Sequence, residues 1–258
     1  MRAVAIFEAV RREGGNELHR PLEALAMSGF VAGLALGFSI LVRATIETHL
    51  PPEPWRPLIS CLGYTFGFLL VVLGQLQLFT ENTIKAVCPV LDEPSPPVWL
   101  KLLRLWSVVL ITNIAGAMTF GGILWLTRDL QPEVWKQSLE ISRHALNFGF
   151  LETLLRGVGA GWLMAALVWM RPTSGTSQPL LVILVTYVIS IADFTHVVAG
   201  STEAAVLVFG GERSFFTAGI KYLIPAALGN FLGGTCAFTL LVWIQIRNEL
   251  LRSKAQER

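Results

Sequence analysis

Charged residues are scarce in this chain of 258 residues, making up 15% of it, whereas soluble domains average about 25%. Cysteine is scarce too: Cys61, Cys88 and Cys236 form no paired spacing, which excludes a disulfide scaffold and a metal or redox motif. The formal net charge is only +2 and no dense basic stretch is present, so we expect no nucleic-acid partner. What is abundant is apolar sequence, 53% of the residues. This composition favours a protein that lies in a lipid membrane.

Long apolar stretches give the number of membrane crossings, because a bilayer core of about 30 Å needs roughly 20 residues of helix. Five stretches contain no Asp, Glu, Lys or Arg: 24–42, 58–80, 105–127, 172–192 and 222–246. A sixth, 157–170, is shorter, and we extend it backwards through 145–151. Glu152 and Arg156 then lie four residues apart inside this fourth span, where we expect a structural ion pair. The sequence therefore predicts an all-α membrane protein with six transmembrane helices.

Lysine and arginine are more frequent at the side that would hold both termini, which predicts cytoplasmic termini. Residues 1–23 begin without the apolar run of a signal peptide, and we expect a cytoplasmic amphipathic segment that rests on the membrane or gates the mouth of a pore. Residues 24–246 form the six-span channel or transporter domain, and 247–258 form a cytoplasmic tail. The predicted location is the inner (plasma) membrane, with membrane lipid as a partner.

The two halves of the chain share sequence features. Phe79-Thr80 closes the second span and Phe194-Thr195 the fifth, and each pair is followed after similar distances by Asn-x-x-Gly, at 113–116 and 230–233. Because each half holds an odd number of spans, the second half would be inverted relative to the first. We therefore predict two inverted three-helix repeats.

Both Phe-Thr segments are expected to interrupt their spans, since polar residues in mid-membrane need internal partners or water. Thr80 and Asn82 are candidate N-caps of one half-helix, and Asp193 and Thr195 of the other. Free N–H groups at such half-helix N-termini suit a small anion. The alternative is a pair of kinks that only pack helices.

Four motifs occur in order on these spans: QLFT at 77–80, RGVGAGWLM at 156–164, FTHVVAG at 194–200 and PAALGNFLGG at 225–234. In this order they resemble the formate/nitrite transporters, and the resemblance covers about residues 18 to 248. It implies an aquaporin-like fold with interrupted second and fifth spans, assembled as a homopentamer. It also implies passage of small monovalent weak-acid anions such as formate, nitrite or hydrosulfide.

The same resemblance implies site residues. His196 matches the central pore histidine, Thr80 the threonine that hydrogen-bonds this histidine or the anion, and Phe79 with Leu78 a constriction. A histidine that titrates near neutrality can give a proton to a weak-acid anion, so we expect pH-dependent and proton-coupled passage. The remaining residues expected along the substrate pathway are Asp193, Phe194, Thr195, Ile189 and Met164.

Several positions depart from the family pattern, and they leave the permeant anion open. Neutral or small residues replace the family's polar ones at Gln77, Ala145, Gly161, Thr195 and Gly200. Ala145 stands at or beside the place of a lysine that draws anions in, so Arg143 and His144 are candidate substitutes. Asp193 is a candidate replacement charge.

Two other function classes were weighed. A neutral-solute pore for water or glycerol could use the same architecture, but the paired Asn-Pro-Ala segments of aquaporins are absent. A membrane enzyme would need a nucleophile with a base or a metal cluster, and the four histidines have no ligand spacing. We therefore expect no enzyme activity and no cofactor.

Overall fold

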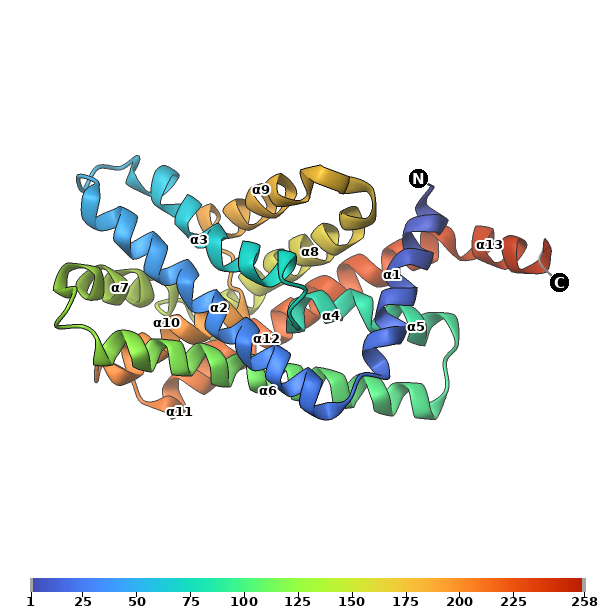
Figure 1. Cartoon of the computed structure of the whole chain (residues 1–258), viewed down its shortest axis with the longest axis horizontal. Coiled ribbons are helices and arrows are strands. Elements are labelled where there is room, and N and C mark those ends of the chain that lie inside the picture. Colours follow the sequence, from blue (N-terminus) through green and yellow to red (C-terminus); the bar gives the residue numbers. More distant parts are fainter. Residues whose placement is uncertain (1, 257–258) are drawn as a thin grey trace.

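The computed structural model describes residues 2–256, with side chains through residue 249, and this part of the chain is helical (Figure 1). The α-helices are α1 (Ala3–Leu18), α2 (Leu22–His49), α3 (Arg56–Leu73), α4 (Phe79–Lys85), α5 (Val87–Asp92), α6 (Pro96–Leu126), α7 (Pro132–Ala145), α8 (Phe150–Ser174), α9 (Gln178–Ile191), α10 (Val197–Phe209), α11 (Phe215–Ala218), α12 (Ile224–Phe231) and α13 (Leu241–Gln256). One 3-10 turn, η1 (Gly175–Ser177), and two π-helical stretches, η2 (Gly219–Leu223) and η3 (Leu232–Leu240), complete the set.

Five helical stretches in the described part are long and apolar enough to cross a membrane: Leu22–His49, Arg56–Leu73, Pro96–Leu126, Phe150–Ile191 and Phe215–Glu249. The longest of them turns back at η1, where Gly175 has a φ of 51°, so that α8 and α9 pack against each other (Figure 1). Large apolar side chains such as Leu62, Ile111 and Leu184 are exposed on the outside of the bundle. Such a surface is stable only in contact with lipid or another apolar partner.

The fourth span is shorter than the sequence analysis predicted. Residues 132–145 form a separate helix, α7, and α8 begins only at Phe150, after a connection that contains Gly149. The predicted backward extension to Ala145 is therefore wrong. Pro172, taken as the start of the fifth span, lies in the last turn of α8, and α9 begins at Gln178 with a proline in its first turn.

The N-terminal helix α1 packs against α4, α5 and α8. Phe7 and Val10 are buried in a cluster with Ile84 of α4 and Cys88 of α5. Its Gly14 lies against the backbone carbonyl of Lys85, where a side chain would collide. The helix is thus docked on the bundle. It also contacts α13, so the two ends of the chain lie at the same end of the molecule (Figure 1).

The predicted tail, 247–258, continues α13 as far as Gln256, and residues 257 and 258 lie outside the described residues. Lys85 is the last residue of α4 and is buried.

The predicted second and fifth spans both lead into a break in the helix, at 74–78 after α3 and at 192–196 after α9. Each break contains one non-glycine residue in the left-handed region, Gln75 (φ 53°) in the first and Asp193 (φ 52°) in the second. Such backbone conformations are held only where the surroundings support them. The first break begins earlier than the predicted end of the span at Thr80, because the chain already leaves the helix after Leu73.

The predicted N-caps are wrong. The N-cap of α4 is Leu78, which makes no side-chain cap, and the N-cap of α10 is His196. The first backbone donors of both half-helices are instead satisfied by asparagines from other helices. Asn113 of α6 accepts a hydrogen bond from the Phe79 N–H at 2.9 Å, and Asn230 of α12 accepts one from the Val197 N–H at 2.9 Å.

These two asparagines define how the halves of the chain correspond. The amide of Asn113 also donates to the carbonyls of Gly29 and Gln77, both at 2.8 Å. The amide of Asn230 donates to the carbonyls of Gly157 and Thr195, at 2.9 and 2.8 Å. Hydrogen bonds of this buried kind satisfy backbone groups that the breaks leave without helical partners.

The two halves therefore correspond in a different register from the one predicted. Phe79 corresponds to Val197, and Leu78 corresponds to His196, since these residues hold the same positions relative to the two asparagines. The predicted pairing of Phe79-Thr80 with Phe194-Thr195 is wrong by three residues. The predicted pairing of Asn113 with Asn230 agrees with the hydrogen bonds.

Candidate functional site

Thr80 and His196 meet where the two half-helices begin. Thr80 is the second residue of α4, His196 is the N-cap of α10, and Thr80 Oγ1 lies 2.9 Å from His196 Nε2. Both side chains are buried. The Ala199 N–H donates to His196 Nδ1 at 3.3 Å. Because a backbone N–H can only donate, a neutral ring carries its proton on Nε2 and donates to Thr80, whose own hydroxyl hydrogen can then serve another acceptor.

Apolar side chains surround this hydrogen bond. The ring of Phe68 lies edge-on to His196, with centroids 5.0 Å apart. Four residues predicted for the substrate pathway are buried in the same apolar cluster as Phe68: Leu78, Phe79, Met164 and Ile189. Apolar side chains therefore surround the Thr80–His196 pair.

The half-helix N-termini offer fewer free donors than the sequence analysis predicted. The N–H groups of Phe79, Val197 and Ala199 are already bound by side-chain acceptors. A small anion at this depth would therefore meet the Thr80 and His196 side chains before it met these backbone donors.

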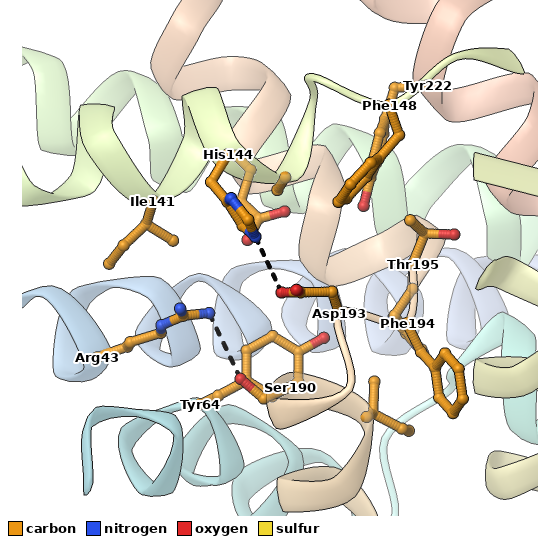
Figure 2. Close-up of a pocket in the computed structure, with 14 residues that line it drawn as sticks. Arg43, Tyr64, Ile141, His144, Phe148, Ser190, Asp193, Phe194, Thr195 and Tyr222 are labelled. Atoms are coloured by element: carbon orange, nitrogen blue, oxygen red, sulfur yellow. Dashed lines mark hydrogen bonds and ion pairs between the residues drawn. The ribbon is translucent and has the colours of Figure 1, made fainter. Parts of the chain in front are cut away.

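A cavity of about 30 Å³ is lined in part by His196. Figure 2 shows other residues around it, among them His144, Asp193 and Thr195. A larger hollow of about 440 Å³ shares part of its wall with this cavity. Arg43, Ile141, His144, Ser190 and Asp193 line both. These residues therefore separate an outer hollow from an inner cavity that reaches the central histidine.

The other predicted residues of the fifth-span break have specific partners. The Asp193 carboxylate lies 3.1 Å from His144 Nε2, as Figure 2 shows, and the Asp193 carbonyl accepts from Arg156 at 3.2 Å. The Thr195 hydroxyl donates to the Thr153 carbonyl at 2.7 Å. Asp193, Phe194 and Thr195 all line the inner cavity. The predicted ion pair between Glu152 and Arg156 is present, at 2.9 Å.

The structure explains two departures from the family pattern. A side chain at Gly161 would collide with the backbone of Asn230, and one at Gly200 would collide with the hydroxyl of Tyr222. Gly161 is therefore a requirement of close helix packing. At Gly200, the ring of Tyr222 occupies the space that a longer side chain would need.

Of the two candidate substitutes for the missing lysine, only His144 lies at the cavity. Ala145 lines the inner cavity beside it. Arg143 turns away and forms a two-pronged ion pair with Glu212, at 2.7 and 2.5 Å. Hydrogen bonding from Arg143 lowers the pKa of Glu212 below its usual range. The Arg143 charge is thus used in joining α7 to the connection after α10.

Sequence reasoning missed five polar residues of the inner cavity: Arg43, Tyr64, Ser190, Glu203 and Tyr222. Arg43 directly follows the first predicted apolar stretch, 24–42. Glu203 lies in a run of otherwise uncharged residues, 194–211, that was not assigned to a span. An isolated acidic residue inside such a run is itself a signal of function in a membrane protein.

A second group of buried charges lies at the other end of the bundle. Lys85 of α4 binds Glu81 at 2.5 Å and Glu13 of α1 at 2.7 Å, while Arg171 of α8 binds Glu81 at 3.2 Å. These ion pairs connect the docked N-terminal helix to α4 and α8. No group of three or more His, Cys, Asp or Glu residues suited to a metal ion occurs in the described part of the chain.

Comparison with known proteins identifies the family. The profile of the family described as "Formate/nitrite transporter" matches residues 4–244. "Inner membrane protein YfdC" of Escherichia coli (strain K12) is 36% identical, over 99% of this chain and 83% of that protein.

Two solved structures are similar in fold. An "FNT family ion channel" superposes with a TM-score of 0.75 at 21% identity, covering 94% of this chain and 98% of that one. A "Pentameric formate channel with formate bound" superposes with a TM-score of 0.71 at 22% identity, covering 86% of this chain and 96% of that one. The family consists of channels and transporters, which confirms that the chain is not an enzyme. This multi-pass membrane protein belongs to the formate/nitrite transporter family.

Proposed function

We propose that this chain is a pH-dependent, proton-coupled channel or transporter for small monovalent weak-acid anions such as formate, nitrite or hydrosulfide. The observation that carries the proposal is the buried hydrogen bond of 2.9 Å between Thr80 and His196. This hydrogen bond places His196 and the hydroxyl of Thr80 where the half-helices α4 and α10 begin. The similar pentameric structure is a formate channel with formate bound, which supports an anion as the substrate.

The chemistry follows from the cost of moving a charge through an apolar region. A bare anion at the membrane centre costs several kcal/mol. Thr80 offers the passing anion a hydrogen-bond donor. A His196 ring that has taken up a proton from the aqueous side can give that proton to the anion and return to its neutral form, and the resulting neutral acid crosses the apolar segment at much lower cost. Leu78 and Phe79 form the constriction on one side of this pair, and Ile189 and Met164 belong to its apolar wall. On the other side the anion passes Asp193, Phe194 and Thr195.

The proposed architecture has six crossings in two inverted three-helix repeats, as in an aquaporin-like fold. Two observations support this architecture. The helices α8 and α9 are distinct and pack against each other, and Asn113 and Asn230 make matching hydrogen bonds in the two halves of the chain. We further propose a homopentamer in the inner (plasma) membrane with both termini cytoplasmic. The pentameric relative and the Escherichia coli inner membrane protein support this assignment.

The test is flux into proteoliposomes that enclose a pH-sensitive dye, challenged in turn with formate, nitrite, hydrosulfide, acetate, lactate and an uncharged polyol. We expect anion-dependent acidification in the wild-type protein. Flux in His196→Asn should become insensitive to pH between about 5 and 8. Unchanged pH dependence in that variant, or polyol flux without anion flux, would reject the proposal, the latter in favour of a neutral-solute pore.

A further inference from the structure

The inner cavity beside His196 contains polar groups that the rest of the protein does not satisfy. The hydroxyls of Tyr64 and Tyr222 and the carboxyl of Glu203 have no hydrogen-bond partner among the described residues, yet the three side chains are 5%, 3% and 6% exposed. These polar atoms face the cavity, where they can bind water or a small polar ligand.

Arg43 adds a cation to the same cavity. Its side chain is 14% exposed, and its bonds are long: Nε lies 3.3 Å from Glu47 and Nη1 lies 3.5 Å from Ser190 (Figure 2). Its Nη2 has no partner in the part of the chain that the structure describes. Arg56, by contrast, binds Gln137 at 2.6 Å and Glu47 at 3.2 Å and does not line the cavity. The guanidinium of Arg43 therefore keeps donors for a ligand, and a planar guanidinium suits a carboxylate-like anion.

Glu203 approaches the cavity from α10. It interacts electrostatically with Arg43 and Asp193, but no ion pair within 4.0 Å joins Glu203 to Arg43 among the described residues. The other titratable groups around the cavity are Tyr64 of α3, His144 at the end of α7, His196 at the N-cap of α10 and Tyr222 of η2. An ionised Glu203 would repel an anion at Arg43, whereas a protonated Glu203 would donate a hydrogen bond to it.

The size of the cavity limits the ligand. About 30 Å³ is room for roughly two water molecules. We propose, on the basis of the anion function proposed above, that Arg43, Tyr64, Tyr222 and Glu203 form a binding site for one small planar oxyanion of the formate or nitrite class, and that Glu203 carries a proton when the site is filled.

The test is the dependence of flux on formate concentration in proteoliposomes. For Arg43→Gln we expect a rise of about tenfold in the half-saturating concentration, as for the loss of one charge-assisted hydrogen bond. Arg43→Lys should lie between that variant and wild type. The matched control is Arg56→Gln, which removes the same charge and another bond to Glu47 without touching the cavity, and its half-saturating concentration should stay within twofold of wild type.

Glu203→Gln provides the second measurement. It should lower the half-saturating concentration at neutral pH, because the competing carboxylate is gone. In an Arg43→Gln background the same substitution should have little effect, since two residues that share one ligand are not additive. Thermal unfolding in detergent checks that each variant is folded, and if Arg43→Gln fails to fold, Arg43→Lys and Glu203→Gln carry the test.

Two outcomes separate this site from the general function. If wild type carries formate and responds to His196→Asn, but Arg43 and Glu203 variants keep a wild-type half-saturating concentration, the site is wrong and the proposed function stands. If wild type carries none of the anions, both proposals are overturned.

Discussion

Asn113 and Asn230 make the same three hydrogen bonds in the two halves of the chain. Each binds one N–H at the start of a half-helix, one carbonyl in the break before it, and one carbonyl of the first long helix of its half. Both side chains are fully buried. The two asparagines therefore hold the interrupted helices in position.

Removing either asparagine should destabilise the protein strongly. Asn113→Ala or Asn230→Ala leaves three buried backbone groups without partners, and we expect a loss of about 3 kcal/mol or more. Thermal unfolding of the detergent-purified protein would measure it. Asn147→Ala, at an exposed position, is the control. Equal melting temperatures for all three variants would contradict this account of the breaks.

The two glycines that depart from the family pattern should respond differently to substitution. Gly161→Ala meets the backbone of Asn230, which has no room to move, whereas Gly200→Ala meets the side chain of Tyr222. We expect Gly161→Ala to destabilise the protein in every background. Gly200→Ala should be rescued, at least in part, by Tyr222→Leu.

Melting temperatures of these single and double variants check this prediction. Gly219→Ala is the control, because no atom lies within 4 Å of a side chain placed there. Rescue of Gly161→Ala by Tyr222→Leu would show that the collisions have been misassigned.

For anion flux, the hydroxyl of Thr80 should matter more than the volume of its side chain. Thr80→Val keeps the volume but leaves the Nε2–H of His196 without its acceptor, which is unfavourable by about 1–3 kcal/mol. We expect anion flux to fall at least tenfold in Thr80→Val and to persist in Thr80→Ser. Flux measured in parallel proteoliposomes decides this. Equal flux in Val and Ser variants would remove the hydroxyl from the mechanism.

The ion pair between Arg143 and Glu212 should give a small stability contribution that depends on pH. Because Arg143 lowers the pKa of Glu212, the contribution is present above the usual glutamate pKa of about 4.3 and is lost as the pH falls through the lowered value. Both groups are partly exposed, so its size is below about 1 kcal/mol.

Glu212→Gln should therefore melt slightly earlier than wild type at pH 7, and this difference should disappear in acid. Melting curves between pH 3 and 7 test it, with Glu53→Gln at an exposed loop position as the control. A difference that grows in acid would have the wrong sign.

The docking of α1 should depend on Gly14. Gly14→Val would push a side chain into the carbonyl of Lys85, whereas Gly15→Val, with the same cost in helix propensity, meets nothing within 4 Å. We expect faster tryptic cleavage after Arg11 and Arg12 in Gly14→Val alone. Mass spectrometry of timed digests measures this. Equal protection in both variants would show that α1 docks without this contact.

The amino-acid sequence alone determined the class of this protein, and its resemblance to the family pointed to Thr80 and His196 as candidate site residues. Apolar length predicts membrane helices because the requirement is local. Membership of the family was also visible in four short motifs. The pairing of Asn113 with Asn230 could be inferred because their spacing from the breaks is similar in each half.

Only the tertiary structure decided the register of the repeats, the caps of the half-helices and the inner cavity. Leu78 and His196 occupy equivalent positions because asparagines from distant helices bind the residues that follow them, and no local pattern reports this. Arg43 and Glu203 are 160 positions apart in the chain and come to one cavity through the packing of α2 against α10. Hydrophobic runs specify that helices form, whereas contacts between distant helices decide which polar groups meet.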